Sequence, residues 1–374
     1  MLGTSSCLRG RIRIWKKEGW FRHASPHPRN FVLPFFAAAT RPAGETGWRI
    51  SGQSGRLGGQ GAESVMAKKR LCLSVLLAFA AGCGREGDIP FPAATGPEYT
   101  FLVLADTHYG LSQWDDNEAA NKAAIDRMNL LPGTPYPSEA GGGAVGAPLA
   151  AIVAGDLTDT GEFLNWHGYW IFGRHDGFKR DYGQRGEGRI RCPVIAGYGN
   201  HDITEQRTAV ADALRARNGR WSGANLSGDH LHVSWDWGSV HFVHLNLYPG
   251  GPGDARDSLG FLKDDLEQQV GESRRPVVIF HHYGFDPFSF EERWWTEQER
   301  AAYFNVIEPY HVLAIFNGHL HDQGHRVWQG IDAYTAGKAG DGCFLVVHML
   351  PDKMVVAGRT SQGWGASWTQ SLQP

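Results

Sequence analysis

The chain has 374 residues and a formal net charge of −3, but this charge is unevenly distributed. Residues 1–82 hold 13 Lys and Arg against 3 Asp and Glu, so residues 83–374 carry a net charge of −13. This acidic balance argues against nonspecific nucleic-acid binding, which needs Lys and Arg to neutralise phosphates. Residues 83–374 are enough for one large α/β domain with a substantial core.

Residues 66–82 have the layout of a secretory signal peptide. A Lys-Lys-Arg start precedes an apolar run too short to span a bilayer, and small residues follow. Cys83 comes directly afterwards, as in a bacterial lipoprotein signal, although Ala80 stands where Leu is usual. We therefore expect an exported protein, anchored to the membrane through a lipidated Cys83 and periplasmic or on the cell surface. Cleavage after Ala80 by an ordinary signal peptidase stays open, as does a buried apolar helix.

Residues 1–65 precede the internal Met that opens this signal and show no sustained helical or strand period. We interpret them as a non-native or disordered basic extension, and residues 83–98 as a tether. Cys192 and Cys343 remain in the mature part, where a disulfide between them cannot be deduced from spacing.

Apolar runs and helical spacings predict strands that alternate with helices in the first part of the chain and a strand-rich second part. The expected strands are 99–105, 150–154, 193–196, 277–280 and 312–316. The expected helices are 117–130, 208–217 and 259–270, and residues 301–308 are expected to be part of another helix. Residues 230–248 are expected to form a hairpin, and 324–359 to contain short strands. This order predicts two sheets flanked by helices in one domain, 99–360, followed by a C-terminal tail, 361–374.

Five short polar segments follow apolar runs, so their side chains are expected at one edge of a sheet. They are Asp106-Thr107-His108, Gly155-Asp156-Leu157-Thr158-Asp159, Gly199-Asn200-His201-Asp202, His281-His282 and Gly318-His319-Leu320-His321. Together they supply enough ligands for two divalent ions. A bridging carboxylate holds two such ions roughly 3.5–4 Å apart, and the pair lowers the pKa of a shared water. Asp156, at the end of a buried strand, is the candidate bridge.

The remaining ligands divide between the two ions. Asp106, His108 and His321 are expected to hold one metal. Asn200, His281 and His319 are expected to hold the other, although only one of the adjacent His281 and His282 is expected to bind metal.

This ordered set resembles the pattern of the calcineurin-like metallophosphoesterase superfamily over roughly residues 99–359. The resemblance implies a four-layered αββα sandwich of two mixed β-sheets flanked by helices, with the site at the carboxyl ends of the strands. It implies that His201 does not bind metal but contacts the phosphate or protonates the leaving oxygen, oriented by Asp159. It also favours His281 over His282 as the ligand, with His282 lining the site. Asp202 is expected either to support the ligand residues or to be structural.

Two departures from the family pattern narrow the subfamily. Purple acid phosphatases have Tyr where this chain has Asp159, so a tyrosinate-bound ferric ion is not expected. Protein Ser/Thr phosphatases have a phosphate-binding Arg where this chain has Thr160. Mn²⁺, Zn²⁺ and Fe²⁺ all suit the ligand set, and the sequence does not choose among them.

The sequence therefore predicts a two-metal phosphoesterase. It would hydrolyse phosphate mono- or diesters, small or lipid-linked, by in-line attack of a metal-bridging hydroxide, with His201 as general acid or phosphate contact. His282 and Tyr283 are candidate substrate contacts, and Lys338 and Arg326 candidate phosphate contacts. The aromatic segment 283–295 and the patch Trp166, Tyr169, Trp170 and Phe172 are expected either to cover part of the substrate or only to pack loops onto the body.

Two other functions stay open. One is an exported metal- or phosphate-binding lipoprotein without turnover, against which the retained His201 and Asp159 count. The other is a structural cell-surface protein whose motifs are fortuitous.

Overall fold

The computed structural model describes residues 87–110, 117–159, 174–203 and 209–373. The predicted extension 1–65, the signal peptide 66–82 and Cys83 lie outside these residues. So do Thr160 and the patch Trp166, Tyr169, Trp170 and Phe172. Within the described part of the chain, no helix is long and apolar enough to cross a membrane.

One sheet has six strands, and its parallel half carries the first three motifs. The strand order is β15 (Gly363–Ser371), β14 (Lys353–Thr360), β13 (Phe344–Met349), β2 (Tyr99–Leu104), β3 (Pro148–Ala154) and β4 (Val194–Gly197). Strands β2, β3 and β4 run parallel, so their carboxyl ends lie side by side. The expected tail 361–374 is wrong as a boundary, because residues 363–371 pair antiparallel with β14 as the edge strand.

The other sheet has seven strands. Their order is β11 (Gln323–Trp328), β12 (Ile331–Ala336), β10 (Val312–Asn317), β9 (Val277–Phe280), β8 (Val240–His244), β7 (Val233–Trp237) and β6 (Asn225–Leu226). Strands β7 and β8 form the predicted hairpin around Gly238. Strands β11 and β12 turn through Gln329 and Gly330, both with positive φ, as a two-residue hairpin loop requires. A small third sheet pairs β1 (Ile89–Pro90) with β5 (Trp221–Ser222).

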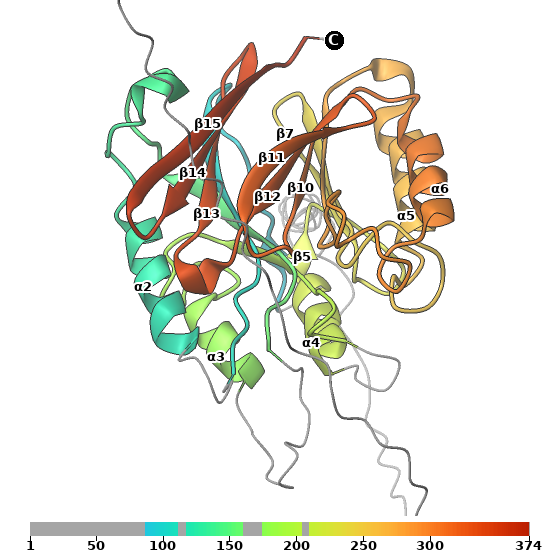
Figure 1. The fold of residues 1–374 in the computed structure, drawn as a ribbon, viewed down its shortest axis with the longest axis horizontal. Helices are drawn as coiled ribbons and strands as arrows, with labels where there is room; N and C mark the ends of the chain where they lie inside the picture. Colours follow the sequence, from blue (N-terminus) through green and yellow to red (C-terminus); the bar gives the residue numbers. More distant parts are fainter. Residues whose placement is uncertain (1–86, 111–116, 160–173, 204–208, 374) are drawn as a thin grey trace, which may run out of the picture. The chain divides into compact units, whose positions relative to one another are not determined.

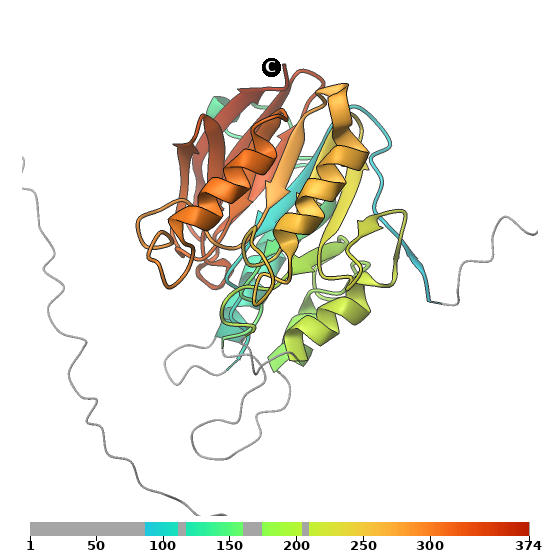
Figure 2. The ribbon, with the colours of Figure 1, turned by 90° about the vertical axis from the view of Figure 1, so that its right-hand side faces the viewer.

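Helices cover the outer faces of the two large sheets (Figures 1 and 2). Helices α2 (Asn117–Asn129) and α3 (Arg174–Asp181) lie on the side of the six-stranded sheet, and α4 (Ala209–Asn218) is tied to β4 by Arg217, which donates to the Val194 carbonyl. Helices α5 (Ser258–Asp265) and α6 (Glu297–Ile307) lie against the seven-stranded sheet. The predicted four-layered αββα arrangement is confirmed.

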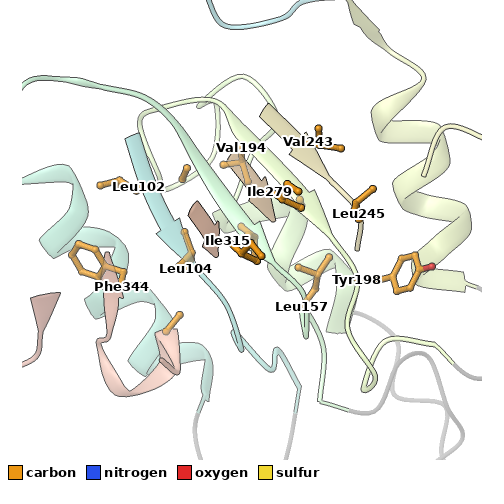
Figure 3. Packing of buried hydrophobic residues seen from close by; sticks show 14 of the residues in the cluster. Leu102, Leu104, Leu157, Val194, Tyr198, Val243, Leu245, Ile279, Ile315 and Phe344 are labelled. Carbon is orange, nitrogen blue, oxygen red and sulfur yellow. The ribbon is translucent and has the colours of Figure 1, made fainter. Parts of the chain in front are cut away.

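The alternation of side chains along β2 shows how the layers are packed. Phe101 and Val103 point between the sheets, where Phe101 meets the rings of Phe242, Phe280 and Phe316 edge to face. Leu102 and Leu104 point outwards into the cluster beneath the helices, part of which Figure 3 shows. A strand buried on both faces is continuously apolar, as this segment is.

Helix ends follow local chemistry as well as apolar spacing. Helix α6, of which residues 301–308 were expected to be part, begins at Glu297, where Thr296 and Glu299 form a reciprocal capping box. Helix α5 ends at Asp265, and the residues expected to continue it form a π-helical turn, Leu266–Val270. Cys192 and Cys343 are both free thiols.

Candidate metal centre

All five polar motifs meet where the carboxyl ends of two sets of parallel strands face each other. Asp106 and Asp156 follow β2 and β3 of the six-stranded sheet, and Asn200 follows β4. His282 follows β9, and the segment 318–321 follows β10 of the seven-stranded sheet. Parallel strands within each sheet and face-to-face packing of the sheets therefore bring together residues that lie far apart in the sequence.

The backbone is strained at this point. Eleven described residues other than glycine have positive φ, and five are candidate ligands: Asp106 (57°), His108 (45°), Asp156 (52°), His319 (69°) and His321 (65°). Such conformations are uncommon for residues with a Cβ and cost on the order of 1–3 kcal/mol each where they are sparsely populated. Backbone hydrogen bonds hold the first loop against the second, from Asp106 N to Gly155 O and from His108 N to Asp156 O, both 3.0 Å.

Two motif glycines allow close approach. A Cβ at Gly199 would overlap the Asp156 carboxylate, and a Cβ at Gly318 would overlap Ala105 and come within 2.7 Å of Asp106 Oδ2. Any side chain at these positions would displace a carboxylate from the site. The glycines of G-N-H-D and G-H-x-H are thus explained by packing against ligands.

The first ligand group comprises Asp106, His108 and His321. The two Nε2 atoms of His108 and His321 are 3.0 Å apart, and Asp106 Oδ1 lies 3.6 Å from the His321 nitrogen and 3.8 Å from that of His108. Ligand atoms 2.0–2.2 Å from a common ion are separated by roughly 3–3.6 Å. The three atoms therefore converge as ligands of one divalent ion would.

The second ligand group centres on His282. Its Nε2 lies 3.0 Å from Asn200 Oδ1 and 3.2 Å from Asp156 Oδ2. The same Asp156 oxygen is 3.7 Å from His108 Nε2 in the first group. Asp156 thus stands between the two groups, where the sequence placed the candidate bridge.

The structure corrects the expectation for His281. Strand β9 continues the alternation of a β-strand, with Ile279 in the outer cluster and Phe280 between the sheets. His281 therefore points outwards, and its ring contacts Phe285, Trp295 and Tyr303 edge to face at centroid distances of 5.4–5.7 Å.

His282 points inwards and takes the place expected for His281. Its Nδ1–H donates to the Ala154 carbonyl at 2.8 Å, which aims Nε2 at Asp156. Metal-binding histidines are commonly oriented by such a bond from the other ring nitrogen. Counting the alternation from the buried strand would have distinguished the two histidines.

His319 lies beside the second group, with its ring centroid 5.2 Å from that of His282. Its Nε2 is buried and has no hydrogen-bond partner, and burial lowers the pKa of its imidazole to about 3. Three aromatic rings and the His282 ring surround it. A neutral imidazole with an unused buried nitrogen is what a metal ligand requires before binding.

His201 lies beside the first group, but its orientation differs from the expectation. Its Nδ1–H donates to the backbone carbonyl of Asp159 at 2.6 Å, while the Asp159 carboxylate lies 3.6 Å from His108 Nδ1. The His201 amide donates to Asp156 Oδ1 at 2.8 Å, which ties this residue to the candidate bridge. The carbonyl of Asp159, and not its carboxylate, orients the His201 ring.

Asp202 has the structural role expected of it. Its buried carboxylate accepts hydrogen bonds from the amides of Gly199, Leu157 and Thr158 and from the Thr158 hydroxyl. It therefore fastens the loop after β4 to the loop after β3.

The electrostatics of the candidate metal centre suit cations. Burial, with a further contribution from the Asp156 charge, raises the pKa of Asp106 to about 8 despite the nearby His282. Burial also opposes ionisation of Asp156, but the charge and hydrogen bond of His282 outweigh it and lower the pKa of this carboxyl. Ligand atoms of Asp106, Asp156 and His282 all lie within 4.8 Å of one another. Two buried carboxylates at such a distance repel each other unless positive charge lies between them. The donor set, the orphaned His319 nitrogen and this repulsion all fit a pair of divalent ions.

Comparison with known proteins identifies the family. Residues 99–323 match the calcineurin-like phosphoesterase family, which covers more than half of the chain, so the chain belongs to this family. No curated protein matches the sequence.

Two solved structures share the fold at low sequence identity. A dimetal phosphatase from Danio rerio is 15% identical, with a TM-score of 0.50 over 74% of this chain and 100% of that one. GAP50, the anchor in the inner membrane complex of Plasmodium, is 11% identical, with a TM-score of 0.50 over 75% of this chain and 90% of that one. One fold thus occurs in a phosphatase and in an anchor, so function must be argued from the site.

Proposed function

We propose that the chain is a two-metal phosphoesterase that hydrolyses phosphate mono- or diesters. The observation that carries this proposal is the position of Asp156, whose Oδ2 lies 3.2 Å from His282 Nε2 and 3.7 Å from His108 Nε2. One carboxylate thus faces both ligand groups, as a dinuclear centre requires.

The two ligand groups would together bind two divalent ions. One ion would be held by Asp106, His108 and His321. The other ion would be held by Asn200, His282 and His319. Asp156 would bind both ions. When bound, the ions would lower the pKa of water between them and neutralise charge on the phosphoryl oxygens. The neutral Asn200 leaves more of the positive charge for an anionic substrate than a carboxylate would. The ligand types suit Mn²⁺, Zn²⁺ or Fe²⁺.

His201 would carry the proton needed by the leaving oxygen. Because its Nδ1–H is engaged by the Asp159 carbonyl, Nε2 is the atom at which a proton is held or given up. Its ring centroid lies 4.6 Å from that of His108, which places it at the edge of the first group. A general acid in such a position contributes roughly 10²–10⁴ to the rate.

The test is metal-dependent hydrolysis. The protein is stripped of metal with chelator and assayed with p-nitrophenyl phosphate and bis-p-nitrophenyl phosphate after Mn²⁺, Zn²⁺ or Fe²⁺ is added back. Restored turnover is expected, and the ratio of the two rates separates monoesterase from diesterase. A protein that binds two metals tightly but hydrolyses neither ester, nor a wider set of phosphate esters, would be the exported metal- or phosphate-binding lipoprotein.

We also propose that the protein is exported and anchored through Cys83. The support is the sequence of residues 66–83 alone. Mass spectrometry of the mature N-terminus in native membranes is expected to find diacylglyceryl-Cys83. Peptides from residues 1–65 in mature material would contradict both the signal and the interpretation of those residues.

A further inference from the structure

An aromatic surface adjoins the second ligand group. The rings of Tyr283, Phe288 and Trp294 lie with their centroids 4.7, 5.2 and 5.3 Å from that of His319. We call these three residues the aromatic wall. All come from the segment between β9 and α6, which the sequence singled out as either a substrate cover or ordinary loop packing.

Within the aromatic wall, Tyr283 packs against a further ring, whereas Phe288 is exposed to solvent. Tyr283 is buried and stacks on Tyr248 at an interplanar angle of 13°. Phe288 is 40% exposed and is one of three large apolar side chains with this much exposure in the described part of the chain. Phe288 therefore presents an exposed aromatic ring directly beside the candidate ligand His319.

A buried carboxylate fixes the position of Phe288. Asp286 is 2% exposed, and its Oδ1 accepts hydrogen bonds from the amides of Phe288 and Ser289, both 3.0 Å. Its Oδ2 accepts a third from the Ser289 hydroxyl at 2.6 Å. The turn that presents Phe288 is therefore held in place before any ligand arrives, which lowers the entropic cost of binding.

The chemistry of the wall favours a flat, electron-rich ligand. The Arg293 guanidinium lies over the rings of Trp294 and Phe288, 4.7 and 5.6 Å from their centroids, and pairs with Glu291 at 2.8 Å. Rings and a guanidinium together bind planar π systems through stacking and cation–π contacts. One exposed phenyl ring offers the area of a single ring, which is too little for a long acyl chain.

We propose that the aromatic wall is the subsite for a planar aromatic substituent, an aryl group or a nucleobase, on the phosphate ester. A phosphoryl group held near His319 would place its substituent within reach of Phe288. This inference rests on the proposed function, since it takes the phosphoryl group to lie between the two ligand groups. It narrows the substrate class from phosphate esters in general to those with an aromatic substituent.

Binding of non-hydrolysable phosphonates tests the proposal without turnover. Isothermal titration calorimetry of the metal-loaded protein compares methylphosphonate, phenylphosphonate and hexylphosphonate. Phenylphosphonate is expected to bind about tenfold more tightly than methylphosphonate, the factor that one ring–ring contact supplies, and hexylphosphonate to gain less. Equal gains for the phenyl and hexyl compounds would overturn the planar subsite in favour of an acyl one.

Two variants of Phe288 test whether the preference for the phenyl compound needs an aromatic ring or only an apolar side chain at this position. One control variant tests whether any exposed apolar substitution has the same effect. Phe288→Ala and Phe288→Leu are expected to bring the ratio of phenylphosphonate to methylphosphonate affinity within about twofold of unity. Val327→Ala, at another exposed apolar position, should leave the ratio as it is. Methylphosphonate binding with no phenyl preference, or a preference that survives in Phe288→Ala, would overturn the inference alone. No binding of any phosphonate would overturn the proposed function with it.

Discussion

The two adjacent histidines after β9 provide a sharp test of the site, because the structure assigns them opposite roles. His282→Ala removes a nitrogen that lies 3.0 Å from Asn200 Oδ1 and 3.2 Å from Asp156 Oδ2. Removing a group that only orients a ligand typically costs 10–100-fold in metal affinity. Loss of the ligand itself is expected to lower the affinity for the second ion about hundredfold or more.

His281→Leu is the matched control one residue away. Both ring nitrogens of His281 are buried without partners, and burial lowers the pKa of the imidazole to about 3. Leaving a polar group buried and unpaired costs about 1–3 kcal/mol, which the substitution removes. The lost edge-to-face contacts with Phe285, Trp295 and Tyr303 contribute about 0.5–1.5 kcal/mol each. The two effects oppose each other: with central values of about 2 kcal/mol for the buried polar group and about 3 kcal/mol for the three contacts, the free energy of unfolding is expected to fall by about 1 kcal/mol.

The assay combines metal analysis with denaturant unfolding of both variants. His282→Ala should retain one ion, and His281→Leu should retain two. If His281→Leu loses an ion while His282→Ala keeps both, the alternation along β9 has been misassigned and the second ligand group is wrong.

Three further predictions concern groups around this centre. His201→Ala should keep both metals and lose roughly 10²–10⁴ in kcat; full activity on an ester with a poor leaving group would refute the acid role. Lys338 lies beside the candidate ligand His321, since its amide donates to His321 O at 3.1 Å. Burial lowers the pKa of His321, and the charge of Lys338 lowers it further. We therefore expect the Lys338 ammonium to bind a phosphoryl oxygen. Lys338→Met should therefore raise KM for a monoester about tenfold, since a hydrogen bond to a charged group contributes roughly 1.5–3 kcal/mol, with a smaller rise for a diester; an equal KM would exclude the contact. Burial opposes protonation of His241, but hydrogen bonds to Asp236 and Asp265 outweigh it and raise the pKa of this imidazole. The pKa is higher in the folded state, so this stabilisation is complete below the unfolded value of about 6.5 and is lost as pH rises through the folded pKa. Unfolding free energies measured at several pH values should show this decline in the native protein and not in His241→Gln.

Much of the fold followed from local patterns. The continuous apolar runs of β2, β3 and β10 predicted strands buried on both faces, and the alternation around Gly238 predicted the β7–β8 hairpin. The polar motifs directly after these strands predicted that Asp106, Asp156 and His319 would lie at one edge. These inferences depend on strand periodicity and parallel pairing, which the sequence carries.

The sequence did not predict three features that depend on tertiary contacts. Strand β15 has intermediate and exposed residues in place of an alternating apolar pattern, and it is a strand because it pairs with β14. The Asp159 carbonyl orients His201 because of the path of the loop after β3, which the residue type does not determine. The family resemblance favours His281 over His282 as the metal ligand. The alternation of side chains that begins at Phe280 instead determines which of the two rings enters the site.

Anomalous diffraction from crystals grown with Mn²⁺ tests the central claim most directly. We expect two anomalous peaks roughly 3.5–4 Å apart, on either side of the Asp156 carboxylate, with His282 and His319 at one peak and His108 and His321 at the other. A single peak, or peaks that do not contact Asp156, would contradict the two-metal centre.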